Sequence, residues 1–138
     1  MLFRSAEIVD IQRQVAVAWV LHAEGKHEEA LKAMSAAADA EDKTEKHVIT
    51  PGPLAPAREL YGFMLLDRGM AKEALAAFEA TKLKEPNRFQ DYAGAAQAAE
   101  KLGDKAKAKD NYQKLVAMVS DGSDRPEVRA ARQYLAQN

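Results

Sequence analysis

The densest group of residues that could perform chemistry is a pair of histidines beside two glutamates. His22, Glu24, His27 and Glu28 lie close together in the chain, and imidazole with carboxylate can hold zinc or act as a general acid and base. A helical zinc site needs its two histidines one turn apart on a single helix face. Gly25 lies between these two histidines and is expected to end the helix there. The sequence therefore predicts no metal ion at this place.

No other residues have the spacing of a catalytic or phosphate-binding site. The chain has no cysteine, which excludes a thiolate nucleophile, a disulfide and a cysteine-based zinc site. No serine stands in the G-x-S-x-G context of an activated nucleophile. Gly52 and Gly62 do not have the spacing of a phosphate-binding loop. We therefore expect a protein that is not an enzyme and that uses no cofactor.

The charge of the chain is nearly balanced, with 20 lysines and arginines against 21 aspartates and glutamates. A formal net charge of -1 gives no electrostatic basis for binding nucleic acid or an anionic membrane. Lysines are frequent between residues 101 and 114, but Glu100, Asp104 and Asp110 are interleaved with them. Such a pattern is typical of solvated helix faces. We expect neither a nucleic-acid partner nor a membrane.

The start of the sequence gives one indication of compartment. Residues 1–7 lack the apolar stretch and the small-residue cleavage site of a signal peptide. The absence of cysteine suits the cytosol and the periplasm alike. The compartment is left open by these features, with the cytoplasm favoured.

The apolar residues of the chain recur at helical spacing, and no segment alternates between apolar and polar residues as a strand would. Three times a glycine is followed five residues later by alanine and four after that by a large apolar residue. The last two copies are 34 residues apart, a period typical of stacked helical hairpins. The three sets are Gly25/Ala30/Met34, Gly69/Ala74/Phe78 and Gly103/Ala108/Tyr112.

Turn and cap signals predict where the helices begin and end. The three repeated glycines are expected at hairpin turns. Asn87 with Gln90, and Asp124 with Glu127, have the spacing of capping boxes at the starts of two helices. We expect helices near 4–24, 27–41, 54–68, 71–84, 88–102, 105–119 and 124–136.

The second hairpin combines small residues, aromatic rings and a proline at fixed spacing: Tyr61, Gly62, Leu65, Ala74, Phe78 and Pro86. This pattern resembles the tetratricopeptide repeat, which spans 34 residues, and in particular the repeat region of bacterial proteins of that family. Arg58 departs from the pattern, because the family has tryptophan there.

The resemblance implies an all-α fold in a single domain over residues 1–138. We expect an α-solenoid of three tetratricopeptide-like hairpins, followed by a C-terminal capping helix at about 124–136. The three repeats fall at about 11–44, 55–88 and 89–122.

About ten extra residues separate the first two repeats, because Gly25 and Gly69 are 44 residues apart. The inserted loop, about 41–53, contains His47 and Thr50, and insertions in repeat proteins often lie on the binding face. One interpretation is a ligand-contacting loop, in which His47 could help to build a small-molecule or metal site. The alternative is a spacer that its prolines make rigid.

The segment from Val15 to Leu21 is apolar around the whole helix, although a terminal helix is expected to have one polar face. Seven residues are too few to span a membrane. Either the chain self-associates through this helix as a homodimer, or a preceding repeat of a longer array covers it. The remaining interpretation is that the small alanine side chains leave little apolar surface exposed.

In the resembled family, the first helix of each hairpin lines a concave groove that binds extended peptides or partner helices. The family register places Trp19, Phe63 and Gln97 at equivalent positions, so we expect one column across the groove. Trp19 and Phe63 are candidate anchors for a partner, and the alternative is that both belong to the core. The groove residues that we single out are Gln12, Trp19, His22, Glu59, Phe63 and Gln97.

One subclass of the family grips the C-terminal carboxylates of chaperones with cationic residues. The matching positions here hold no cation; they are Val15, Trp19, Leu60, Gln90 and Gly94. We therefore predict a non-enzymatic module that binds a peptide or protein segment in its groove without such a clamp. The alternative is a structural element that oligomerises through its apolar first helix.

Overall fold

The computed structural model describes residues 2–44 and 55–138, and every regular element in those two stretches is a helix. The predicted helices are confirmed, and no end differs from its expected position by more than three residues. The helices are α1 (Leu2–Ala23), α2 (His27–Asp42), α3 (Ala57–Asp67), α4 (Ala71–Lys84), α5 (Phe89–Lys101), α6 (Lys105–Ala117) and α7 (Pro126–Gln137).

The hairpin turn at Gly25 has a geometry that recurs in the other two hairpins. Gly25 has a φ of 81°, its N–H donates to the carbonyl of His22, and the next N–H, of Lys26, donates to the carbonyl of Leu21. This pair of bonds closes the end of a helix around a left-handed residue, where glycine has no steric penalty. The same two bonds form around Gly69 and around Gly103. The repeated glycines are therefore confirmed as turn residues.

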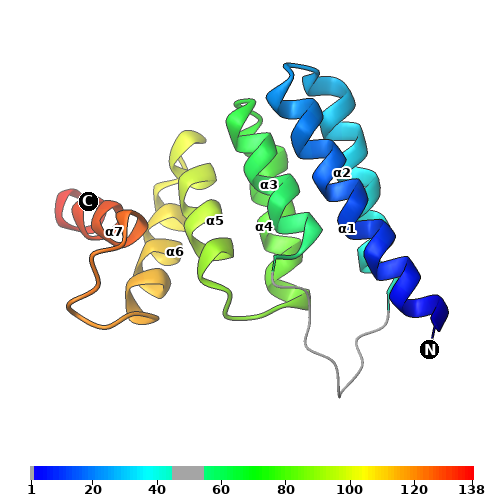
Figure 1. Ribbon diagram of the computed structural model, residues 1–138. Coiled ribbons are helices and arrows are strands. Elements are labelled where there is room, and N and C mark those ends of the chain that lie inside the picture. Colours follow the sequence, from blue (N-terminus) through cyan, green and yellow to red (C-terminus); the bar gives the residue numbers. More distant parts are fainter. Residues whose placement is uncertain (1, 45–54) are drawn as a thin grey trace.

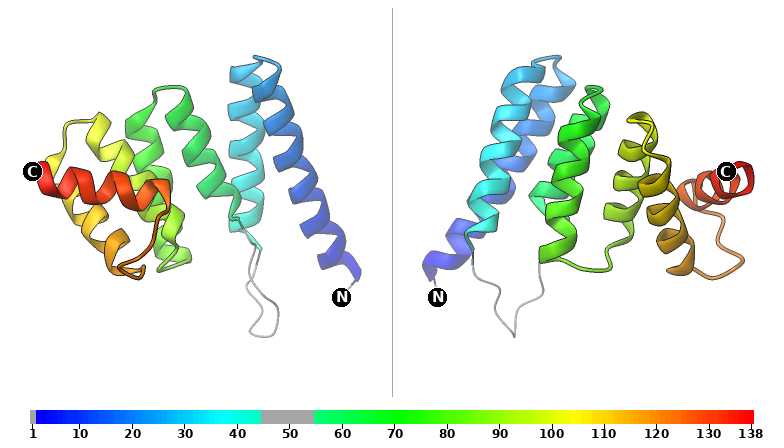
Figure 2. Two further views of the ribbon diagram at one scale, coloured as in Figure 1. Left: turned by 60° about the vertical axis from the view of Figure 1, so that its left-hand side comes forward. Right: turned by 180° about the vertical axis from the view of Figure 1, so that it is seen from behind.

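The hairpins α1/α2, α3/α4 and α5/α6 are stacked side by side as an α-solenoid (Figure 1). Each second helix packs against the first helix of the following hairpin, and α7 packs against α6 at the end of the stack (Figure 2). The first helices α1, α3 and α5 lie on one side of the stack, and we call the surface they present the first-helix surface (Figure 1).

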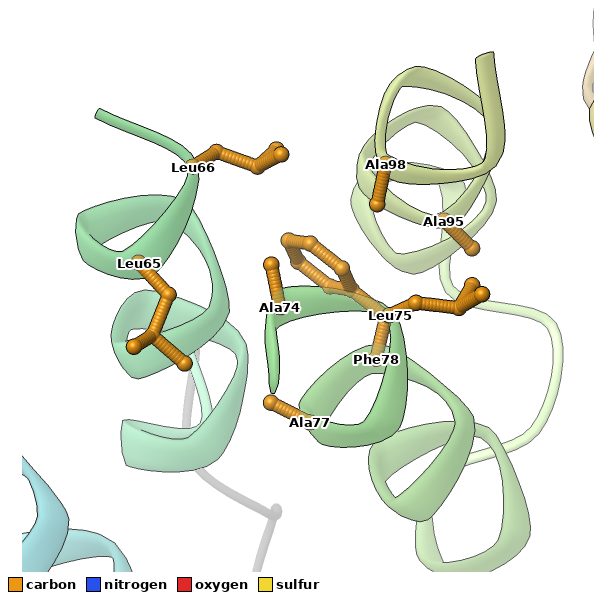
Figure 3. Packing of buried hydrophobic residues seen from close by; sticks show 8 residues of the cluster. All are labelled: Leu65, Leu66, Ala74, Leu75, Ala77, Phe78, Ala95 and Ala98. Carbon is orange, nitrogen blue, oxygen red and sulfur yellow. The ribbon is translucent and has the colours of Figure 1, made fainter. Parts of the chain in front are cut away.

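The core of the second hairpin is built around the ring of Phe78, which is completely buried. The ring points from α4 toward the space between α3 and α5 (Figure 3). A Cβ added at Gly62 on α3 would lie 2.8 Å from this ring, and one at Gly94 on α5 would lie 2.3 Å from it. Both glycines are therefore needed for the close approach of the helices. The packed residues are Leu65, Leu66, Ala74, Leu75, Ala77, Phe78, Ala95 and Ala98.

The two predicted capping boxes are wrong. Asn87 lies two residues before α5 with a φ of 65°, because the chain turns sharply there, and its side chain does not cap the helix. The carboxylate of Asp124 instead accepts a hydrogen bond from Arg129 at 2.6 Å, so it does not cap α7. A side-chain cap does form at α6, where Asp104 accepts from the N–H of Lys107 at 3.0 Å.

Candidate functional site

Trp19 on α1, Phe63 on α3 and Gln97 on α5 belong to the three first helices, and all three residues are half-buried. Trp19 packs beside the buried cluster that includes Met34 and Met64. The Phe63 ring meets the ring of Phe78 edge to face, with 4.9 Å between centroids. Both aromatic residues therefore contact the core, and each is also partly exposed.

A chain of polar contacts runs beside Trp19 and connects three helices. His22 meets the Trp19 ring edge to face, with 5.6 Å between centroids. The Nε2 atom of His22 lies 3.4 Å from Oδ2 of Asp67 at the end of α3. The Nδ1 atoms of His22 and His27 are also 3.4 Å apart, which joins α1 to α2.

The contact between the two Nδ1 atoms is a hydrogen bond in which one imidazole ring donates and the other accepts. Desolvation lowers the pKa of His27, and the charges of Arg68 and His22 lower it further. A neutral His27 fits this arrangement. His22 thus contacts Trp19, and its contact with Asp67 connects the first hairpin to the second.

In the two described stretches, no three metal-ligating side chains come together as ligands for an ion. His22 and His27 meet as a pair, and their remaining polar contact is the carboxylate of Asp67. The hydrogen bond between the two rings links α1 to α2.

Glu59 lies elsewhere on α3 and is almost completely buried, with 3% of its surface exposed. Its two oxygens accept hydrogen bonds from Arg88, at 2.9 Å from Nε and 3.3 Å from Nη2. A carboxylate held in this way contributes to the junction between the second and third hairpins, because Arg88 directly precedes α5. Sequence reasoning did not identify Arg88, since nothing in its local pattern marks a partner 29 residues away.

Asp91 on α5 is the third member of this buried group and has no exposed surface. Its Oδ2 atom is 4.0 Å from Nε of Arg88, beyond hydrogen-bond distance. Desolvation raises the pKa of Asp91 to about 8; the charge of Glu59 adds to the rise, and Arg88 opposes it. We refer to Glu59, Arg88 and Asp91 as the carboxyl cluster.

The other predicted site residues are not brought into these clusters. Gln12 is exposed on α1, and Gln97 stands half-buried on α5. His47 and Thr50 lie outside the described residues, so the interpretations of the inserted loop remain open.

The flanks of the inserted loop are joined by contacts that the sequence did not predict. Arg58 binds Asp39 and Asp42, with its Nη2 atom 2.7 Å from an oxygen of each. The N–H of Ala57, at the start of α3, donates to a carboxylate oxygen of Glu41 at 2.8 Å. Arg58 thus fastens α3 to the end of α2 at the position where the family pattern has tryptophan.

The arrangement of the helices has a counterpart among solved structures. It is similar to the crystal structure of PcrH from Pseudomonas aeruginosa. The TM-score is 0.71 at 17% sequence identity, over 93% of this chain and 90% of the other. This likeness supports a tetratricopeptide-like helical-repeat fold. No protein-family model and no curated protein match the sequence.

None of the described helices is both long and apolar enough to cross a bilayer.

Proposed function

We propose that this chain is a non-enzymatic module that binds a peptide or protein segment across the first-helix surface. The observation that carries the proposal is the pair of partly exposed aromatic rings, Trp19 and Phe63, at equivalent positions of two successive hairpins. Large aromatic side chains that rest on a rigid base dominate many protein interfaces, because they bury much area and lose little conformational entropy. Gln97 stands at the equivalent position of the third hairpin, on α5, and offers a hydrogen-bonding amide to the same partner.

The partner that we propose is not held by its terminal carboxylate. A carboxylate clamp needs cations that face the ligand. Among the clamp positions, Val15 and Leu60 are half-buried apolar residues, and Gly94 is buried against Phe78. An apolar segment flanked by hydrogen-bonding groups suits this surface better.

Replacing Trp19 with alanine is expected to weaken the binding of a selected peptide by about 30-fold, which corresponds to about 2 kcal/mol. Peptides are first selected from a displayed library on the unmodified protein, and their dissociation constants are then measured by calorimetry. Phe63→Ala is expected to act in the same direction with a smaller loss, since part of its ring is committed to Phe78.

Leu83→Ala is the matched control for these variants. Leu83 is a large apolar residue on α4 with 89% of its surface exposed, and it does not belong to the first-helix surface. Its removal should leave peptide affinity unchanged. Peptides that bind Trp19→Ala and Phe63→Ala as tightly as the unmodified protein would disprove the assignment of the surface.

Self-association through α1 is a second candidate, and exposed valines favour it. Val9, Val17 and Val20 are 62%, 43% and 56% exposed. They lie on one face of α1, because at 3.6 residues per turn their positions fall within about 80° of one another around the helix. Exposed apolar patches of this kind are typical of interaction sites. We call these three residues the valine face.

The double variant Val17→Glu/Val20→Glu is expected to convert a dimer into a monomer, because charges within an apolar contact lose their hydration. Sedimentation velocity over a concentration series from about 5 to 500 µM measures the change, since association depends on protomer concentration. Leu83→Glu places the same charge on another exposed apolar site and should not alter the mass. An unmodified protein that stays monomeric over the whole series excludes this candidate.

A further inference from the structure

The carboxyl cluster contains one side chain, Asp91, whose oxygens have no hydrogen-bond partner in the described stretches when all its members have their ordinary charges. Both oxygens of Asp91 are buried and have no hydrogen-bond donor among the described residues. Buried polar atoms in native proteins nearly always have a partner, because an unpaired one loses its hydration without compensation. An ionised Asp91 would have this cost together with that of a buried charge.

The cations nearest to Asp91 are bonded to other groups. Arg88 is closer to Glu59, at 2.9 Å, than to Asp91, at 4.0 Å. Lys82 approaches from α4, but its Nζ atom bonds to Glu79 at 2.9 Å and to the side chain of Asn111. Two buried carboxyl groups therefore face one guanidinium, which can neutralise one of them.

We propose that Glu59 and Asp91 share one proton, which Asp91 carries as a neutral carboxylic acid that donates its O–H to the Glu59 carboxylate. The cluster is then neutral, with Arg88 balancing Glu59. The proton supplies the missing donor, and the resulting O–H···O⁻ bond links α3 directly to α5. This proton adds to the packing and to the Arg88–Glu59 pair that join the second and third hairpins, whether or not a partner occupies the first-helix surface.

The pH dependence of this link has a definite sign. The pKa of Asp91 in the folded protein, about 8, is above the value near 4 of an aspartate in an unfolded chain. The unfolded chain therefore releases the proton first as pH rises. The stabilisation is fully present below about pH 4 and is lost progressively toward pH 8. Over the neutral range, raising the pH loosens the junction between the two hairpins.

Carboxyl-carbon NMR of the unmodified protein tests the proposal without any substitution. With ¹³C-labelled aspartate and through-bond assignment, the side-chain carboxyl signal of Asp91 should remain in its protonated position at pH 6 and titrate above pH 7. Asp10 is an exposed aspartate whose pKa is lowered by hydrogen bonds from Arg13 and Gln14, and it should be fully ionised at pH 6 in the same sample. An Asp91 signal that titrates with a midpoint below pH 5 would overturn the proposal.

Asp91→Asn provides an independent measurement, because the amide can donate to Glu59 but cannot ionise. Denaturant midpoints are compared at pH 5.5 and pH 8.5. The unmodified protein should lose more stability than Asp91→Asn over this interval, and the control Asp110→Asn, at an exposed aspartate paired with Lys114, should behave like the unmodified protein. Equal losses in the unmodified protein and Asp91→Asn would contradict the shared proton. If Asp91→Asn does not fold, the NMR titration decides alone.

Discussion

Replacing Gly94 with alanine is expected to lower the free energy of unfolding by about 3 kcal/mol, at the upper end of the usual cost of overpacking a core. The added Cβ would lie 2.3 Å from the Phe78 ring, and Gly62 blocks the same edge of that ring from α3. The ring therefore cannot move aside without displacing a helix. Alanine gains about 1 kcal/mol over glycine in helix propensity, which only partly offsets the clash. Chemical denaturation measures the net effect.

The order of related variants tests the cause of this loss. Gly62→Ala should cost less than Gly94→Ala, because its Cβ would lie 2.8 Å from the ring. In a Phe78→Leu background, Gly94→Ala should cost much less than in the unmodified protein, since a smaller flexible side chain can yield. Gly122→Ala is the control, with no atom within 4 Å of the added carbon. A Gly94→Ala protein as stable as the unmodified one would contradict the packing described for Phe78.

Replacing Arg88 with methionine is expected to lower the free energy of unfolding by about 3 kcal/mol at pH 7, since it leaves the buried Glu59 carboxylate without its cation. This loss is at the lower end of the range for breaking buried ion pairs, because the Arg88 side chain is 26% exposed. The loss should be smaller in a Glu59→Gln background, where no buried carboxylate is left at that position. Denaturation curves of the two pairs of proteins give both differences.

Arg129→Met is the control for the Arg88 variant. Arg129 pairs with Asp124 on the surface, where both side chains are more than half exposed. Exposed ion pairs contribute about 0–1 kcal/mol, so this variant should remain close in stability to the unmodified protein. Similar losses in the two variants would show that the burial of Glu59 does not matter.

The hairpins could be predicted from the sequence because their signals are local. The turn at Gly25 is closed by two local bonds, from Gly25 to a carbonyl three positions back and from Lys26 to a carbonyl five positions back. The helical spacing of apolar residues determines which helix faces meet. Gly62 also belongs to a local signal, because it is part of the short pattern in the second hairpin that resembles the tetratricopeptide repeat. Local patterns of this kind are enough to predict the hairpins, because they involve no residue far away in the chain.

The polar clusters could not be predicted because their members are far apart in the chain. Glu59 meets Arg88, and His22 meets Asp67, only after the hairpins have stacked. Their distances depend on how the helices cross, which no spacing in the sequence records. Glu59 was therefore expected in an open groove, whereas the structure places it against Arg88. No local pattern marks Asp91 either, because its unusual environment results from burial in the folded protein.

The most direct test of the central claim is to locate a bound peptide on the folded protein. ¹⁵N-labelled protein is titrated with a peptide selected on the unmodified chain, and backbone shift changes are mapped onto the helices. The binding account predicts that the largest changes follow α1, α3 and α5 around Trp19, Phe63 and Gln97. Changes concentrated on α2, α4 and α6, or on the valine face alone, would contradict it.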